Sequence, residues 1–252
     1  MIKLENVCVS YGKRLVLHDV SAAFERGRVT AIIGANGCGK TTLLKTALGI
    51  LPAFEGDVTV DGNALSAMST RERAKKMAYL AQSRSLPRMT VEQLVLHGRY
   101  AHLAFPHVYS THDKRTADAA IGRMGLTDVA DRMLSELSGG MRQNAYIAMA
   151  LSQSSDYILL DEPTTYLDIA NRLQLMRTLR ELAEEGKGVV VVLHDLILAL
   201  KYADAIAVMR EGRVVLQAEP QEVFSSGALR DVFGVEIRSI VDGDSMDYYV
   251  KE

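Results

Sequence analysis

The chain has 252 residues, of which 48% are hydrophobic, and its 29 basic and 31 acidic residues give a net charge of −2. This length allows one large hydrophobic core, or a core with a small subdomain. The near-zero charge argues against a nucleic-acid-binding protein, because such proteins usually carry a strong basic patch. The longest apolar stretch, 188–200, is interrupted by His194-Asp195 and is shorter than the roughly 20 residues of a bilayer span.

The first 60 residues have the pattern of short strands. We expect strands at Ile2–Tyr11, Asp19–Glu25 and Val58–Asp61, separated by turn residues. These strands predict an antiparallel layer. The N-terminus lacks the charged region and apolar stretch of a secretory signal. Because the longest apolar stretch is too short to span a bilayer, a function at a membrane would need a span supplied by another chain.

A phosphate-binding loop is predicted between a strand at 29–33 and a helix at 42–48. The segment fits G-x-x-x-x-G-K-[ST], in which glycines let backbone N–H groups turn toward a phosphate without a side-chain clash. The lysine adds a mobile positive charge, and the following hydroxyl is the usual Mg²⁺ ligand. The strand-loop-helix context predicts a nucleoside triphosphate site, whose candidate residues are Gly34, Asn36, Gly37, Cys38, Gly39, Lys40, Thr41 and Thr42.

A helical pattern replaces the strand pattern from Thr90 to about Leu134. It predicts a small helical subdomain inserted into a three-layer α/β core. Before it, the basic cluster Arg71–Lys76 includes Glu72 and is predicted to be the solvated face of an exposed helix.

A second phosphate-binding device is predicted at Leu137–Gln143, where Ser138, Gly139 and Gly140 open a helix. Their hydroxyl and unhindered N–H groups lie at the positive end of the helix dipole, which favours an anion. An ordinary capped helix is the alternative interpretation.

Two further apolar runs end in polar residues. Asp161-Glu162 follows 157–160, and His194-Asp195 follows 189–193. Continuous apolar runs are typical of parallel strands, whose carboxyl ends gather the chemistry of the fold. We therefore expect Lys40, Asp161, Glu162 and His194 at one sheet edge.

The two cysteines, Cys8 and Cys38, have no metal-binding spacing and fit a reduced compartment. Cys38 lies near a helix N-terminus and Lys40, which can lower the pKa of a thiol and make it reactive. A tolerated variable position in the loop is the other interpretation.

These motifs, in this order and over nearly the whole chain, resemble the ATP-binding cassette family, the ATPase subunits of ABC transporters. The match extends to Tyr11 as the residue that stacks on adenine, to Gln82 as the Q-loop, to Leu167-Asp168 as the D-loop and to His194 as the switch histidine. Two positions depart from the family pattern. Met141 replaces the usual glutamine of the signature, and Thr165-Tyr166 precedes the D-loop where a serine is common. The departures leave every phosphate contact in place.

The resemblance implies an α/β fold of the P-loop NTPase (RecA-like) type with an antiparallel β subdomain and an inserted α-helical subdomain. We expect one ABC domain over 1–252, with its core at 1–85 and 138–252 and the helical subdomain at about 86–137. ATP and Mg²⁺ are the implied cofactors.

Roles for the site residues follow from the same resemblance. Glu162 is the implied general base or orienter of the attacking water, and His194 braces the γ-phosphate. Gln82 and Lys40 are the other implied catalytic residues, and Asp168 belongs to the nucleotide site. The implied metal residues are Thr41, Gln82 and Asp161. Phosphoryl transfer needs this positioning and positive charge around the transferring group.

The resemblance also implies partners. Two copies would sandwich two ATP molecules head to tail, with Ser138, Gly139 and Gly140 of one copy on the γ-phosphate bound to the other. The pair would act at the cytoplasmic face of a membrane on separate permease subunits, and indirectly with a substrate-binding protein. We expect a permease helix to contact Ser83–Met89 and to bury its apolar side chains against Leu86, Met89 and Tyr100. The alternative interpretation is that Leu86 and Met89 only pack the helical subdomain onto the core.

The cargo remains open at this stage. Gly98–His102, Asp113 and 165–169 resemble the ATPases of bacterial importers for ferric siderophores, haem and cobalamin. Iron-siderophore or haem import is the leading hypothesis, with cobalamin or another metal importer as alternatives. A soluble ABC ATPase of translation or DNA repair is a further alternative, but the single cassette without a heptad stretch disfavours it.

Overall fold

The computed structural model describes residues 1–82, 85–165, 167–242 and 245–251. Two compact units are present, one formed by Met1–Met68 with Met176–Glu252 and the other by Ser69–Leu175. Ser83 and Arg84 of the expected permease contact, and Tyr166 immediately before the D-loop, lie outside the described residues. The division into a core and a subdomain at about 86–137 stays a prediction.

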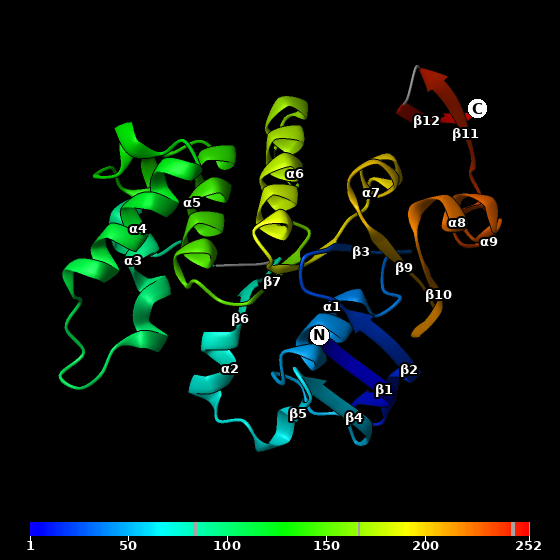
Figure 1. Cartoon of the computed structure of the whole chain (residues 1–252), viewed down its shortest axis with the longest axis horizontal. Helices are drawn as coiled ribbons and strands as arrows, with labels where there is room; N and C mark the ends of the chain where they lie inside the picture. The colour runs from blue at the N-terminus through cyan, green and yellow to red at the C-terminus, as the bar shows by residue number, and fades with distance from the viewer. Residues whose placement is uncertain (83–84, 166, 243–244, 252) are drawn as a thin grey trace. The chain divides into compact units, whose positions relative to one another are not determined.

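Parallel strands form the centre of the first unit (Figure 1). β3 (Val29–Gly34) lies between β8 (Gly188–Val192) and β9 (Ala205–Arg210) and is parallel to both, while β10 (Arg213–Ala218) is antiparallel to β9. Every residue of β3 and β8 is buried, as expected for continuous apolar strands covered on both faces. The predicted α/β fold with a parallel sheet is confirmed.

The predicted antiparallel layer is also confirmed, in the order β2-β1-β4-β5. Its strands are β1 (Ile2–Tyr11), β2 (Arg14–Phe24), β4 (Glu55–Val60) and β5 (Asn63–Ala64). β2 begins five residues before the predicted start at Asp19. The remaining elements of this unit are α1 (Lys40–Ala47), η1 (Leu65–Ala67), α7 (Leu196–Tyr202), α8 (Pro220–Ser225), α9 (Ala228–Phe233), β11 (Glu236–Asp242) and β12 (Ser245–Lys251).

The second unit combines a parallel strand pair with a group of helices. β6 (Met77–Leu80) is parallel to β7 (Tyr157–Asp161) and follows α2 (Thr70–Lys76). The predicted helical region contains α3 (Val91–His97), η2 (Gly98–His102), α4 (Thr111–Arg123), η3 (Thr127–Val129) and η4 (Leu134–Glu136). α3 and α4 pack against each other and against α5 (Gly139–Ser152), and the three helices are drawn in teal and green in Figure 1.

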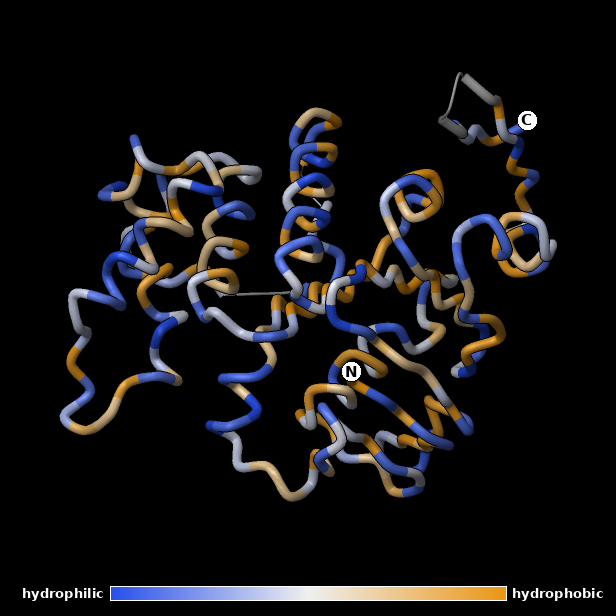
Figure 2. Tube along the Cα trace, in the orientation of Figure 1, coloured by the Kyte–Doolittle hydropathy of each residue, from blue (hydrophilic) through white to orange (hydrophobic). Residues whose placement is uncertain are grey.

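α6 (Ile169–Glu184) begins in the second unit and ends in the first. Its hydrophilic and hydrophobic residues alternate along the tube in Figure 2. The buried side chains recur at helical spacing, at Leu175, Met176, Leu179, Leu182 and Ala183. One face of α6 is therefore a core face.

Candidate functional site

The predicted phosphate loop connects β3 to α1. Gly37 and Gly39 have φ of +77° and +107°, in the region that only glycine adopts readily. Gly34 has no room for a side chain, because a Cβ there would lie 2.5 Å from the Met209 carbonyl oxygen and 2.6 Å from Cys38 Sγ. The three glycines are thus required by this backbone path.

Lys40 is buried in the first turn of α1. Its Nζ donates hydrogen bonds to the carbonyl oxygens of Gly34 (2.8 Å) and Ala35 (3.1 Å). An ammonium group has three donors, so a phosphate oxygen can accept the third. Next to it, Thr41 is half-buried and Thr42 is buried, whereas Asn36 is exposed at the crest of the loop.

Cys38 is buried within the loop, and burial raises the pKa of its thiol, with Lys40 opposing this effect. Of the two interpretations of Cys38, the one that requires a lowered pKa is therefore contradicted. The helix N-terminus and Lys40 favour the thiolate, but removal from water disfavours it more strongly.

His194 and the phosphate loop follow adjacent parallel strands of the first unit. β3 pairs with β8 from Val29↔Val189 to Ile32↔Val192, so both strands end at the same edge. His194 is exposed there, immediately before Asp195, which caps α7 by accepting the N–H groups of Ile197 and Leu198. The same unit carries Tyr11 at the end of β1, with 49% of its surface exposed.

Gln82 and Glu162 come together in the second unit. They follow the parallel strands β6 and β7, which pair up to Leu80↔Leu160, and Gln82 Nε2 donates to Glu162 Oε2 at 2.7 Å. Glu162 is half-buried and has φ of +52°, a conformation that is uncommon for a non-glycine residue and often marks a functional site. Asp161, one residue earlier, is buried at the end of β7.

The signature residues begin α5 as predicted. Ser138 is exposed and caps the helix by accepting the Met141 N–H at 3.3 Å, with Gly139 and Gly140 in the first turn. Farther along the helix, Gln143 Nε2 donates to the Pro163 carbonyl oxygen at 2.6 Å. This bond, which sequence reasoning missed, attaches α5 to the turn that carries Glu162.

Asp168 is exposed at the beginning of α6. Its Oδ1 accepts the Asn171 N–H and its Oδ2 accepts Asn171 Nδ2, both at 2.8 Å. The predicted site residues thus form two groups. Tyr11, the phosphate loop and His194 belong to the first unit, and Gln82, Ser138, Gly139, Gly140, Asp161, Glu162 and Asp168 belong to the second.

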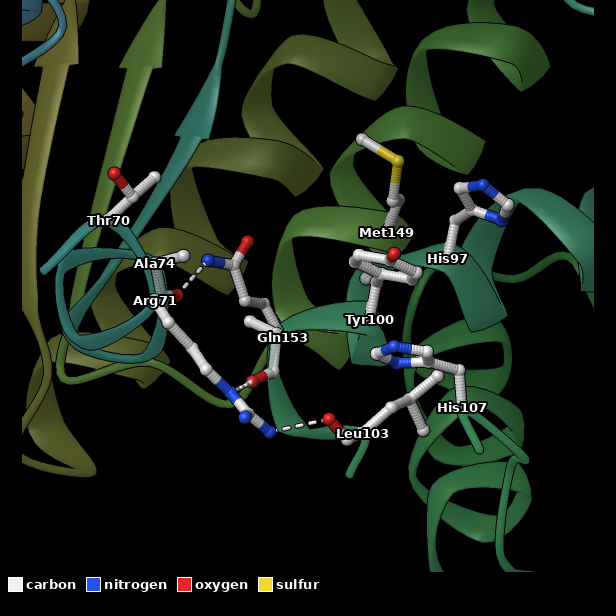
Figure 3. A pocket seen from close by; sticks show the side chains of 11 residues that line it. Thr70, Arg71, Ala74, His97, Tyr100, Leu103, His107, Met149 and Gln153 are labelled. Atoms are coloured by element: carbon white, nitrogen blue, oxygen red, sulfur yellow. Dashed lines mark hydrogen bonds between the residues drawn. The ribbon is translucent and has the colours of Figure 1, made fainter. Parts of the chain in front are cut away.

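A cavity of about 530 Å³ lies within the second unit (Figure 3). It was not predicted from the sequence, because its lining comes from separate elements, at Thr70, Arg71, Ala74, His97, Gly98, Tyr100, Ala101, Leu103, His107, Met149 and Gln153. Figure 3 shows the rings of Tyr100 and His107 close together, and their centroids are 5.7 Å apart. Leu86 and Met89 are not among the lining residues.

Arg71 is more than part of a solvated face. α2 has no buried residue, as expected for an exposed helix. However, the Arg71 guanidinium donates to the carbonyl oxygens of Ala101 (3.0 Å) and Leu103 (2.5 Å). These two bonds hold α2 against η2 and the segment that follows it, and so form one side of the cavity.

Among the described residues, no helix is both long enough and apolar enough to cross a membrane. Residues 17–165 match the family model described as ABC transporter. The petrobactin import ATP-binding protein FpuD of Bacillus anthracis is 39% identical over 96% of this chain and 89% of its own length. The ferric enterobactin transport ATP-binding protein FepC of Escherichia coli K12 is 38% identical, over 94% and 89% respectively.

Solved structures agree with these relatives. An inward-facing transporter described as of the metal-chelate type superposes with a TM-score of 0.85, at 26% identity, over 100% of this chain and 97% of that chain. A dimeric bacterial ABC transporter cassette superposes with a TM-score of 0.78, at 28% identity, over 87% and 99%. Matches of this extent, to a chain whose phosphate loop and signature helix fold as predicted, show that the protein belongs to the ABC transporter family as one of its ATPase subunits.

Proposed function

We propose that this chain powers the import of an iron chelate, an iron-siderophore or haem, through a separate membrane permease at the cytoplasmic face. The observation that carries this proposal is the similarity, at 38–39% identity over nearly the whole chain, to ATP-binding proteins named for petrobactin import and ferric enterobactin transport. A substrate-binding protein would deliver the chelate to the permease. In this proposal the chelate passes through the permease, and the chain contacts nucleotide and its protein partners.

The phosphate loop and Lys40 bind the ATP phosphates, and Tyr11 stacks on adenine. In support, the Lys40 ammonium is buried against the loop and retains a donor for phosphate. The Tyr11 ring is half exposed at the end of β1. In this proposal Glu162 orients or deprotonates the attacking water, and His194 contacts the γ-phosphate.

Mg²⁺ fits the proposed donor set. Thr41, Gln82 and Asp161 offer a hydroxyl, an amide and a carboxylate oxygen, the hard ligands that this cation prefers. Gln82 donates to Glu162 through Nε2, so its Oε1 is the atom that a cation would take. When bound, the cation supplies positive charge to the phosphate oxygens.

Two copies of the chain would complete each other's sites. Ser138, Gly139 and Gly140 lie at a helix N-terminus, where N–H groups and the helix dipole favour a phosphate. We place them on the γ-phosphate bound to the partner copy, with Asp168 nearby in the interface. Hydrolysis and phosphate loss would remove the charge that holds the two copies together.

Two variants test the nucleotide roles. Lys40→Ala is expected to abolish Mg²⁺-dependent ATP hydrolysis and to weaken nucleotide binding. Glu162→Gln keeps the side-chain size and is expected to retain ATP binding, to slow hydrolysis by roughly 10²-fold or more, and to elute as a dimer with ATP in size-exclusion chromatography. Wild-type turnover in either variant, or a monomer of Glu162→Gln at saturating ATP, would contradict the proposal.

Leu86 tests the permease contact. It is 48% exposed, whereas Met89 is half-buried and its carbonyl oxygen accepts the Leu134 N–H, so Leu86 is the position less tied to the fold. Leu86→Glu is expected to reduce chelate uptake while the isolated subunit keeps its ATPase activity. Ile50→Glu, at an apolar side chain that is 58% exposed in the first unit, is the matched control. Unchanged uptake with Leu86→Glu would show that the contact is misplaced.

A further inference from the structure

The hairpin turn between β9 and β10 contacts the phosphate loop within the first unit. Arg210 pairs with Arg213, so the turn consists of two residues, Glu211 and Gly212. Their φ angles are +48° and +76°, the combination of a type I′ turn. Gly212 is the second residue of this turn, where glycine is the common choice.

Gly212 is hydrogen-bonded on both sides of its backbone. Its N–H donates to the Cys38 carbonyl oxygen at 2.9 Å, and its own carbonyl oxygen accepts the His18 N–H at 2.9 Å. A continuous chain of hydrogen bonds therefore runs from β2, through the turn, to the phosphate loop. Arg213 adds a third contact, because its Nη1 donates to the His18 carbonyl oxygen at 3.2 Å.

The bond to Cys38 controls the direction of a neighbouring amide. A trans peptide is planar, and its C=O and N–H groups point in opposite directions. A hydrogen bond that holds the Cys38 carbonyl toward Gly212 therefore holds the Gly39 N–H toward the other side. The N–H groups of such loops bind phosphate. The turn therefore fixes the direction of one of these groups, the Gly39 N–H.

Close packing makes this contact intolerant of a side chain. A Cβ on Gly212 would lie 2.1 Å from the Val16 carbonyl oxygen and 2.5 Å from His18 Cδ2. The end of β9 also packs closely on the first residue of the loop. A Cβ on Gly34 would lie 2.5 Å from the carbonyl oxygen of Met209 in β9. The turn and the strand end thus form a stiff support for the loop.

We propose that the Glu211-Gly212 turn is a strut that positions the phosphate loop, and that Gly212 is a positioning residue for nucleotide binding. This inference rests on the proposed contact between the loop and the ATP phosphates, and it adds a residue that lies about 170 positions away in the sequence. Gly212 acts through Cys38 and Gly39 and does not touch the nucleotide.

Gly212→Ala tests the strut. The added Cβ must displace the turn, and the loss of the bond to Cys38 leaves the Gly39 amide less well held. We expect the Kd for ADP and the KM for ATP to rise roughly tenfold, the scale of one lost hydrogen bond. The kcat at saturating ATP should change little, because an amide that binds phosphate equally in the ground and transition states contributes to KM alone.

Gly62→Ala is a closely matched control. Asp61 and Gly62 form another two-residue turn of the first unit, between the paired residues Val60 and Asn63, with φ of +50° and +80°. A Cβ on Gly62 meets nothing within 4 Å. This variant carries the same backbone strain without the strut contact, so its Kd and KM should remain those of the wild type.

Gly212→Asn separates strain from crowding. Asparagine tolerates a positive φ better than alanine does, but it brings the same Cβ against Val16. The strut therefore predicts weakened binding in both Gly212 variants, with melting temperatures used to confirm that each is folded. Nucleotide affinity equal to that of Gly62→Ala in a folded Gly212→Ala protein would overturn the strut. Failure of the wild type to bind ATP would instead overturn the proposed nucleotide site.

Discussion

A buried ion pair holds the helical part of the second unit together. Arg99 Nε lies 2.9 Å from Asp113 Oδ1, and the two side chains are only 5% and 10% exposed. Arg99 also donates to the Ser152 carbonyl oxygen at 2.9 Å, and Asp113 accepts the Ser110 hydroxyl at 2.6 Å. The pair thus connects η2, the start of α4 and the end of α5.

Replacing one partner leaves the other charge buried without compensation. Asp113→Asn keeps the size of the side chain and an oxygen for Ser110, and we expect it to lower the free energy of unfolding by about 3–5 kcal/mol. Arg99→Met should cost a similar amount. The double variant, Arg99→Met with Asp113→Asn, carries neither of the two buried charges. The unfolding free energy that it loses should therefore be smaller, by about 2 kcal/mol or more, than the sum of the losses in the two single variants.

Urea denaturation of the wild type, the two single variants and the double variant, followed by circular dichroism, measures the coupling energy between Arg99 and Asp113. Lys76 and Asp156 give a control cycle in the same unit, since they lie 2.8 Å apart but are 40% and 32% exposed. Their coupling should stay below about 1 kcal/mol, as for other solvent-screened pairs. A coupling of Arg99 and Asp113 no larger than that of the control would refute the argument from burial.

Three further predictions concern the same units. The Ser110 hydrogen bond and the Arg99 charge lower the pKa of Asp113 from 3.8 to about 2. The ionised Asp113 therefore stabilises the fold fully above the unfolded pKa, and this stabilisation is lost as the pH falls from about 4 to 2. Unfolding measured across this pH range should show no such loss of stability in Asp113→Asn. Gly98→Ala should lower the free energy of unfolding by about 1–3 kcal/mol, because the Cβ would lie 2.2 Å from a main-chain oxygen of α5. Gly122→Ala in α4 should be neutral or stabilising, because the Cβ would make only an ordinary contact, 3.9 Å from Thr127 Oγ1. Cys38 should react slowly with iodoacetamide at neutral pH and faster as the pH rises, because burial raises the pKa of its thiol. Mass spectrometry would compare its labelling rate in the native protein and in the denatured chain. Equally rapid labelling of both would contradict this prediction.

Elements with a local signal were predicted well. β3, α1 and the start of α5 follow from apolar runs and glycine motifs within a few residues. β2 was placed too late because His18-Asp19 interrupts the apolar pattern. Asp19 has φ of +53° and the register with β1 shifts around it, yet pairing with β1 extends the strand back to Arg14. Tertiary pairing outweighed the local pattern there.

Contacts between distant segments left no signal in the sequence. No sequence motif singles out Gly212, whose hydrogen bond to Cys38 is visible only in the fold. Asp113 was noted only for its resemblance to the importer ATPases, and its ion pair with Arg99 was not predicted. The bonds from Arg71 to two carbonyl oxygens are equally invisible, because a backbone acceptor has no sequence identity. A chemical role follows from residue type and motif, whereas a positioning role depends on which segments the fold brings together.

α5 illustrates how positioning links the motifs of the second unit. Ser138 caps its N-terminus, and Gln143 in the next turn donates to the carbonyl oxygen of Pro163, beside Glu162. The Tyr146 hydroxyl donates to the Ser85 carbonyl oxygen at 2.7 Å, in the segment after Gln82. A helix of 14 residues is stiff over this distance. Engagement of a phosphate at its N-terminus would therefore act on the Glu162 turn and on the Gln82 segment together. In the proposed dimer, this would give each copy a physical path from the partner's nucleotide to its own candidate base and to the segment next to the proposed permease contact.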